Sequence, residues 1–393
     1  MRCTIFVAAP AMLRRLARAA TQQQGALWAR GSGSQAGIPT HVVDLRSDTV
    51  TKPGPAMRRS MAEAVVGDDD YGEDPTVREL QATAAELLGV ERTLFMPTNT
   101  MANLISVMYH CQCRGSPLLL GQECHLHVQA QGGVAQIAGA HSHPLPDLPH
   151  GTLDLAELEG LVARSLGSRS HPVCELICLE DAHSSSGGWV LPIECLCQPS
   201  LVHLLAQSYG VQVHLDGARL MNAAVALCMP PARIVEHCDS VSLRFSKGLG
   251  APVGALVGRP KGFTEEAWRL QKALGGGMCQ AGVLAAAALV GLTDAEEVLL
   301  KDHQNAQRFA RGELASPVCS VDLTTVETNT VRVRVDGLPP EELCQRLQTM
   351  SADEVAQTGH AVLRAVWHRD ISAQDTKLAL GKWAFVLRAL RMG

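Results

Sequence analysis

Aromatic residues are scarce in this sequence, at 4% of 393 residues, so leucine, valine and alanine must form most of the core. Basic residues are not in excess either: 34 lysines and arginines stand against 39 acids, which gives a formal net charge of −5. Nucleic-acid binding needs a basic surface, so we expect no nucleic-acid partner. The sequence also lacks an apolar run long enough to span a bilayer, so we expect no membrane partner.

The cysteines do not form the pattern of a disulfide framework, because there are 13 of them and they are scattered through the chain. A reducing compartment explains them more simply. Two Cys-X-Cys pairs, Cys111/Cys113 and Cys195/Cys197, lack the spacing of a structural zinc site. We therefore predict thiols without a metal.

Acids are absent from the first 43 residues, and the first one is Asp44. The same stretch contains five arginines, and residues 12–20 alternate arginine with leucine and alanine at helical spacing. This pattern is typical of a mitochondrial transit peptide, and a solvated tail on a cytosolic protein is the alternative. In either case residues 1–40 are expected to lie outside the fold.

Strand and helix patterns alternate through the next part of the chain. Short apolar strands are expected at residues 93–96, 118–120, 175–179, 211–215 and 240–245, and helices at 76–88, 101–109, 201–209 and 281–292. The proline-rich stretch around His141 and His143 is expected to be a loop. This alternation predicts an α/β fold whose mostly parallel sheet has helices on both faces.

The pattern changes after about residue 300. Strands are expected at 331–335 and 365–368, and helices at 340–350 and 374–391. We therefore predict a large domain over residues 41–300 and a small C-terminal α+β domain over residues 301–393.

Polar residues follow several of the predicted strands, and ligands of α/β sheets bind at the carboxyl ends of strands. Glu180 and Asp181 end one strand, Asp216 ends the next, and Lys247 follows a third in a glycine-rich loop. A lysine near other cations has a lowered pKa and can form an imine. An aspartate can hold a pyridinium nitrogen protonated, so that the ring accepts electrons.

A fourth polar group lies at residues 98–100, between a predicted strand and a predicted helix. The N–H groups at the start of a helix favour an anion such as a phosphate. Each group alone is a weak signal, but their order on successive strands predicts a site for pyridoxal phosphate (PLP).

Five segments resemble the motifs of low-specificity L-threonine aldolases. They are residues 43–51 (VDLRSDTVT), 67–76 (GDDDYGEDPT), 214–220 (HLDGARL), 246–254 (SKGLGAPVG) and 275–282 (GGGMCQAG). The resemblance extends from about residue 43 to the C-terminus. It implies the fold type I of PLP-dependent transferases with a seven-stranded sheet, a homotetramer, and cleavage of L-threonine or L-allo-threonine to glycine and acetaldehyde.

The resemblance also implies a role for each matched residue that touches the cofactor. Lys247 would carry PLP as an imine beside Ser246, Asp216 would pair with the pyridine nitrogen, and His125 would stack on the ring. The remaining cofactor contacts would be Thr98, Asn99 and Thr100 around the phosphate, Arg219 near the ring, and Lys272 from a neighbouring subunit.

For the amino-acid substrate, the resemblance implies that Ser47, Arg219 and Arg364 bind the carboxylate. Tyr71 belongs to a loop expected at the subunit junction. The β-hydroxyl proton would pass to His125, to His171 or to a water that they position. The implied catalytic residues are thus Lys247, His125, His171 and Asp216.

The sequence departs from the family pattern in several places. Asn99 replaces a glycine, Asp181 an asparagine, Cys279 a phosphate-binding arginine, and residues 129–130 an aromatic-glutamate pair; the segment 354–364 is short. We expect Asn99 to tolerate a left-handed backbone. Asp48 and the acids of residues 68–70 are interpreted as solvated loop charges. Two alternatives stay open: a weakened or inactive aldolase that keeps the fold, and a PLP enzyme for β-elimination or racemisation.

Overall fold

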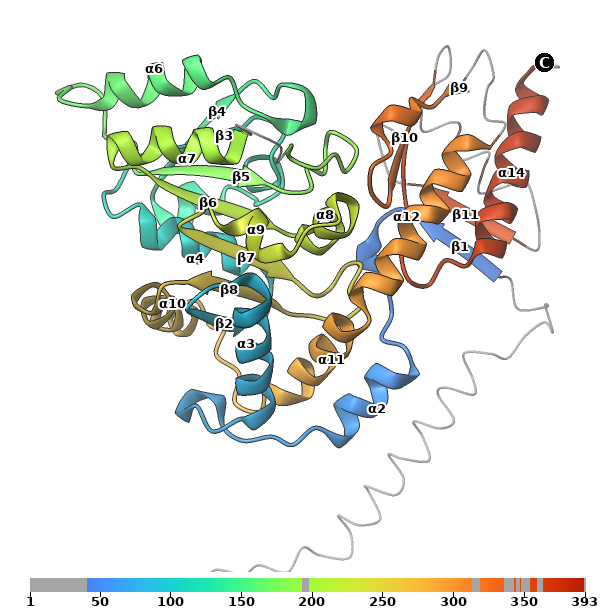
Figure 1. The fold of residues 1–393 in the computed structure, drawn as a ribbon, viewed down its shortest axis with the longest axis horizontal. Helices are drawn as coiled ribbons and strands as arrows, with labels where there is room; N and C mark the ends of the chain where they lie inside the picture. The colour runs from blue at the N-terminus through green and yellow to red at the C-terminus, as the bar shows by residue number, and fades with distance from the viewer. Residues whose placement is uncertain are drawn as a thin grey trace, which may run out of the picture. The chain divides into compact units, whose positions relative to one another are not determined.

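A seven-stranded sheet lies at the centre of the computed structural model (Figure 1). The structure describes residues 41–192, 198–312, 319–335, 343, 347, 354–358 and 363–391. The order across the sheet is β2 (Arg92–Met96), β8 (Ala255–Arg259), β7 (Ser240–Arg244), β6 (Gln212–Gly217), β5 (Leu176–Glu180), β3 (Pro117–Gly121) and β4 (His141–Leu145). Only β8 runs against its neighbours, so the predicted mostly parallel sheet is confirmed.

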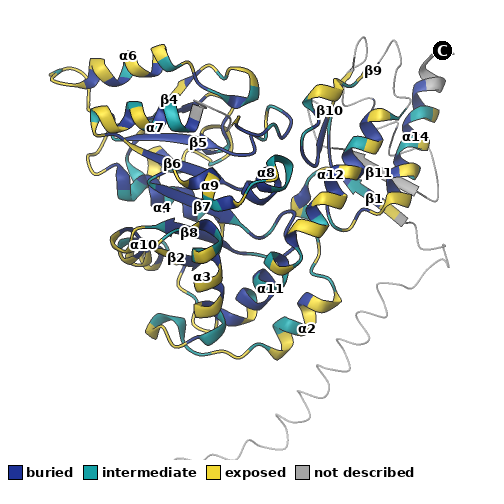
Figure 2. Cartoon of the chain, viewed as in Figure 1, coloured by how far each residue is buried: buried dark blue, intermediate teal, exposed yellow. Residues whose placement is uncertain are grey.

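Helices cover both faces of this sheet because its strands alternate apolar side chains between two cores. Leu94 and Met96 face α4 (Asn99–His110) and α10 (Lys261–Ala273), whereas Phe95 points to the opposite core. That second core is closed by α3 (Pro75–Leu88), α6 (Leu155–Ser165), α7 (Gln198–Tyr209), α9 (Pro231–Val235) and α11 (Gly282–Thr293). Figure 2 shows the inner strands β5 to β8 as largely buried and the outer sides of the helices as exposed.

Capping residues fix several helix boundaries. The Asp74 side chain accepts hydrogen bonds from the N–H groups of Thr76 and Val77, both at 3.0 Å, at the start of α3. Gly89, with φ of +61°, ends the same helix in the left-handed conformation that glycine adopts readily. These signals are local, which is why the helix expected at 76–88 is found at Pro75–Leu88.

The stretch expected to be a proline-rich loop is instead the edge strand β4. His141 and His143 pair in register with Pro117 and Leu119 of β3. Pro144 is tolerated because β4 has a neighbour on one side only, and an edge strand has no partner for a second row of N–H groups.

The C-terminal part forms a separate antiparallel sheet of β9 (Cys319–Ser320), β10 (Thr330–Val335) and β12 (Leu363–Val366). α12 (Ala295–Arg311) and α14 (Ala373–Arg391) pack on each other beside it. β1 (His41–Leu45) pairs with β11 (Glu354–Thr358), and its Val43 and Leu45 belong to the C-terminal core. Most of the helix expected at 340–350 lies outside the described residues.

Short elements connect these layers. They are η1 (Asp48–Val50), α2 (Pro55–Glu63), η2 (Asp69–Tyr71), α5 (His125–Val128), η3 (Val134–Ala138), η4 (Pro149–Gly151), α8 (Leu220–Leu227) and η5 (Leu323–Thr325). Over the part of the chain that is described, no helix has both the length and the apolar character to cross a membrane.

The C-terminal core depends on one aromatic cluster, in which Phe309 lies 4.8 Å from the Trp367 ring and 5.6 Å from the Trp383 ring. We expect Phe309→Ala to lower the free energy of unfolding by about 3–5 kcal/mol, because it opens a cavity among buried rings. Phe385→Ala on α14, where the side chain is 57% exposed, is the control and should change it by less than about 0.5 kcal/mol. Urea unfolding followed by circular dichroism measures both, and equal effects would contradict this assignment of the core.

Candidate functional site

The carboxyl ends of β5, β6 and β7 meet at one edge of the sheet. Glu180 pairs in register with Asp216, and Asp216 pairs with Ser242, so the residues that follow these strands are neighbours. Lys247 comes three residues after the end of β7. His125, at the start of α5, donates its backbone N–H to the Glu180 carboxylate at 2.9 Å. The predicted gathering of these groups at the carboxyl edge is therefore observed.

Asp216 is fully enclosed and is held by four donors. The amides of Asn99 and Asn103 on α4 donate to it at 2.9 and 2.6 Å, the N–H of Ala218 at 3.0 Å and the Ser242 hydroxyl at 3.4 Å. Burial alone would raise the pKa of Asp216, but nearby Lys247 and His125, together with the Asn99 bond, bring that pKa below its ordinary value. Asp216 is thus a buried carboxylate that stays negatively charged.

Asn99 acts differently from its expected role. It is the first residue of α4 with Thr98 as the N-cap, and its backbone does not have a positive φ, so left-handed tolerance is not used. Its buried amide nitrogen instead holds Asp216, and its Oδ1 has no hydrogen-bond partner. Thr98 and Thr100 are exposed at the helix start, where N–H groups without intrahelical acceptors favour an anion.

The Lys247 side chain is buried at the same edge. Burial, followed by the charges of Arg219 and Arg244, lowers the pKa of Lys247 from 10.5 to about 7, although Asp48 and Asp216 act in the opposite direction. Its loop is fixed, because the Lys247 carbonyl accepts the N–H of Gly250 at 2.8 Å and the hydroxyl of Thr51 at 3.2 Å. A large fraction of this amine is therefore neutral at physiological pH.

The interpretation of Asp48 as a solvated loop charge is wrong. Its buried carboxylate accepts Nε and Nη2 of Arg219 at 2.7 and 2.8 Å. The remaining Arg219 nitrogen, Nη1, donates to the Ser184 hydroxyl at 2.7 Å. Burial opposes ionisation, but the Arg219 and Lys247 charges hold the pKa of Asp48 far below its usual range. This ion pair fixes Arg219, and the position of Asp48 right after Ser47 in a matched motif was the available signal.

Arg364 and Ser47 approach the site from other segments. Arg364 lies on β12 opposite Arg332 and donates to the Ser184 carbonyl at 3.4 Å, so it converges with Arg219 on one residue. Burial lowers the pKa of Arg364, and no carboxylate among the described residues pairs with it. Ser47 caps η1 next to Asp48.

The structure also brings Arg244, which the sequence analysis did not single out, to this edge. Arg244 is half-buried, and its Nε donates to the Ser246 hydroxyl at 2.9 Å. Its place in the strand pattern was the signal, since residues 240, 242 and 244 share one face of β7.

His171 is not at the site of its own chain, which corrects the predicted position. It lies in an exposed loop and contacts the hydroxyls of Ser168 and Ser170. It lines a pocket with His141 and Pro117, which begin β4 and β3. Those are the amino ends of the strands, whereas Lys247 follows a carboxyl end.

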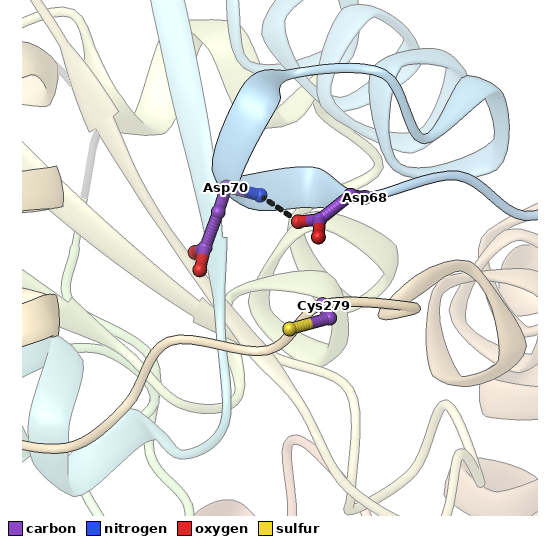
Figure 3. A group of neighbouring side chains, drawn as sticks. All are labelled: Asp68, Asp70 and Cys279. Atoms are coloured by element: carbon purple, nitrogen blue, oxygen red, sulfur yellow. Dashed lines mark hydrogen bonds between the residues drawn. The ribbon is translucent and has the colours of Figure 1, made fainter. Parts of the chain in front are cut away.

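Lys272 pairs with Asp70 at 2.5 Å. Figure 3 shows Cys279 facing Asp68 and Asp70, and the donor atoms of these three side chains lie within 4.8 Å of one another. The positive charge of Lys272 on Asp70 disfavours a cation here. Burial, and then the neighbouring acids, raises the pKa of Asp69 to about 6, so Asp69 is not simply solvated as expected. Tyr71, next in the chain, is 80% exposed.

Asp181 replaces a neutral residue of the family pattern, yet its charge is partly suppressed. It is fully buried, with Oδ1 accepting the Leu191 N–H at 3.2 Å and Oδ2 unpaired. Burial, and then the charges of Glu180 and Glu327, raises the pKa of Asp181 to about 7. When protonated it is neutral, like the asparagine it replaces.

Comparison with known proteins identifies sequence relatives of this chain. The family model of the beta-eliminating lyases matches residues 44–336. The probable low-specificity L-threonine aldolase 2 of Arabidopsis thaliana is 42% identical over 341 residues, which is 86% of this chain and 95% of the relative. The low specificity L-threonine aldolase of Escherichia coli K12 is 36% identical over 349 residues, covering 88% of this chain and all of the relative.

Solved structures resemble the fold. A putative aromatic amino acid beta-eliminating lyase/threonine aldolase from Exiguobacterium sp. 255-15 superimposes with a TM-score of 0.71 at 17% identity, covering 88% of this chain and 97% of the other. A putative L-allo-threonine aldolase from Listeria monocytogenes gives 0.69 at 18% identity, with 89% and 96% covered. These likenesses confirm the predicted fold class.

The Asp48–Arg219 pair yields a prediction, because removing one member leaves the other charge buried and unpaired. Asp48→Asn and Arg219→Gln should each lower the free energy of unfolding by about 3–5 kcal/mol. The double variant should lose less than the sum of the two, by about 1–3 kcal/mol. Guanidinium unfolding of the four proteins gives the coupling. Strict additivity would show that the pair does not act as one unit.

Proposed function

This chain belongs to the low-specificity L-threonine aldolase family of the beta-eliminating lyases, and we propose that it cleaves L-threonine and L-allo-threonine to glycine and acetaldehyde with PLP. It is a lyase. The observation that carries the proposal is that a buried lysine of lowered pKa, Lys247, and a buried, charged aspartate, Asp216, lie at the same edge of the sheet. Buried titratable groups with shifted pKa values of this kind cluster at functional sites.

The residues at this edge fit PLP. Asp216 remains an anion and offers lone pairs to a protonated pyridine nitrogen. Lys247 offers a neutral amine to the aldehyde carbon. The start of α4 at Thr98–Thr100 offers N–H groups to the phosphate. Arg219 and Arg364, which converge on Ser184, offer two guanidinium groups to the carboxylate of the amino acid.

When bound, PLP supplies an electron sink for the pair released as the Cα–Cβ bond breaks. Arg219 cannot turn away from the site, because Asp48 holds two of its nitrogens. Asp216 keeps its charge because four donors stabilise it. Lys247 would hold PLP at its aldehyde carbon, because its largely neutral amine is a nucleophile.

His125 is the residue that we assign as the base for the β-hydroxyl. Its backbone is fixed by Glu180, and burial lowers the pKa of His125, so that the neutral imidazole can accept a proton. His171 lies at the opposite edge of the sheet, so within one chain His125 serves alone.

We further propose a homotetramer located in mitochondria, with a role in glycine formation. Tyr71, which is 80% exposed, lies in the loop that the resemblance assigns to a subunit junction. The acid-free, arginine-rich N-terminus supports import. Light scattering tests the subunit number, and a monomer in solution would contradict it. Imaging of tagged full-length chains and chains lacking residues 1–40 tests the location.

The reaction is tested with Lys247→Ala and, as a control, Lys261→Ala on the exposed start of α10. Purified wild-type protein and the control should show a visible absorbance band from bound PLP, and borohydride should attach this PLP covalently to Lys247. Both proteins should release acetaldehyde from threonine. Lys247→Ala should lose both the fixation and at least about 1000-fold in kcat, since the amine that exchanges with substrate is gone.

The products separate this proposal from the alternatives. Ammonia and a keto acid in place of acetaldehyde would identify β-elimination, and a change of substrate handedness would identify racemisation. A chain that binds PLP but turns over neither threonine nor allo-threonine would be an inactive aldolase.

The pKa of Lys247 gives a pH prediction for cofactor capture. Only the neutral amine attacks an aldehyde, and the neutral fraction rises as pH passes through the pKa. With a pKa of about 7, the rate of PLP capture by cofactor-free protein should rise between about pH 6 and 8 and then level off. Stopped-flow absorbance measures this rate. A rate still rising steeply above pH 9 would show that Lys247 keeps an ordinary pKa.

A further inference from the structure

Arg244 is a half-buried cation at the proposed cofactor site that no motif accounts for. Its side chain contacts Ser246, and among the described residues no carboxylate pairs with it. Arg219, by contrast, is neutralised by Asp48. A guanidinium that loses part of its hydration without gaining an anionic partner is costly, and it points to an anion from outside the chain.

The packing of α4 on the sheet shows where Arg244 stands. At the C-terminal end of α4, His110 contacts Ser240 of β7 at 2.8 Å. Further toward its start, Asn103 contacts Asp216, and Asn99 contacts the same carboxylate. The helix therefore runs opposite to the parallel strands, and its first turn lies at their carboxyl ends.

The alternation of β7 then places Arg244 under this first turn. Ser240 and Ser242 both face α4, since Ser242 shares Asp216 with Asn99. Arg244 is the next residue on that face, one step closer to the carboxyl edge. Arg244 is paired in register with Ala255 of β8, and Ala255 is paired on its other side with Met96 of β2. Met96 comes two residues before Thr98, the N-cap of α4.

We propose that Arg244 binds the phosphate of PLP together with the start of α4. This assignment rests on the proposed function. It also answers a departure of the sequence: Cys279 stands where the family resemblance implies a phosphate-binding arginine, and here Cys279 lies beside Asp68 and Asp70 (Figure 3). Lys272, the other expected phosphate contact, is paired with Asp70. Arg244 restores a positive charge to the phosphate site from within the sheet.

The test compares PLP with pyridoxal, which has the same ring and aldehyde but no phosphate. Dissociation constants of both aldehydes are measured by absorbance titration of cofactor-free full-length protein. Arg244→Gln should weaken PLP binding about 10- to 100-fold, the loss expected for a hydrogen bond to a charged group, and leave pyridoxal binding within about 2-fold. Arg244→Lys keeps the charge and should lie between wild type and Arg244→Gln. Arg233→Gln, at an exposed arginine on α9, is the control and should match wild type.

The outcomes separate the two proposals. Equal weakening of both aldehydes would make Arg244 a structural residue, and no weakening of either would show that the phosphate does not contact it; both results overturn the inference. Wild-type protein that captures neither aldehyde on Lys247 would overturn the proposed function itself. Inorganic phosphate gives a second readout, because its inhibition constant for PLP binding should be higher in Arg244→Gln than in wild type.

Discussion

The buried charge of Asp216 is the constraint on which the rest of this site depends. A carboxylate without water is unstable unless donors and cations surround it. Here the donors come from α4, from the turn after β6 and from β7, so three elements must pack correctly before the charge is tolerated. The apolar faces of these strands and helices supply that packing. The same core that stabilises the fold thus sets the protonation of the reacting groups.

Asp48 and Arg219 extend this dependence to the ends of the chain. Asp48 follows β1, which packs in the C-terminal core, and its carboxylate also accepts the Asn329 amide at 3.4 Å. Asn329 in turn donates to the Trp367 carbonyl at 2.8 Å. One hydrogen-bonded series therefore joins the N-terminal segment, the end of β6 and the C-terminal sheet. Displacement of the C-terminal sheet would move Arg219 as well as Arg364.

The sequence predicted what is local or periodic. Parallel strands, the boundaries of those expected helices that lie in the described residues, and the lysine and aspartate at strand ends all follow from apolar patterns and from residues adjacent in the chain. Burial of a charge, however, is decided by distant segments. Asp48 looked like a loop acid because its partner is 171 residues away, and Asn99 looked like a turn residue because Asp216 is 117 residues away. His171 was misplaced for the same reason: spacing along the chain does not tell which edge of a sheet a loop reaches.

The positive charges at this edge of the sheet can bind two anionic groups of a ligand. Asp48 neutralises Arg219, and Asp216 is held by four hydrogen-bond donors. Arg244 and Arg364 remain without carboxylate partners among the described residues, at the β7 and β12 sides of the site. An amino-acid complex of PLP carries two anionic groups, a phosphate and a carboxylate. Binding would then give each of the two guanidinium groups an anionic partner. Because a ligand that binds only the folded state stabilises that state, the cofactor and the substrate would also stabilise this edge of the sheet.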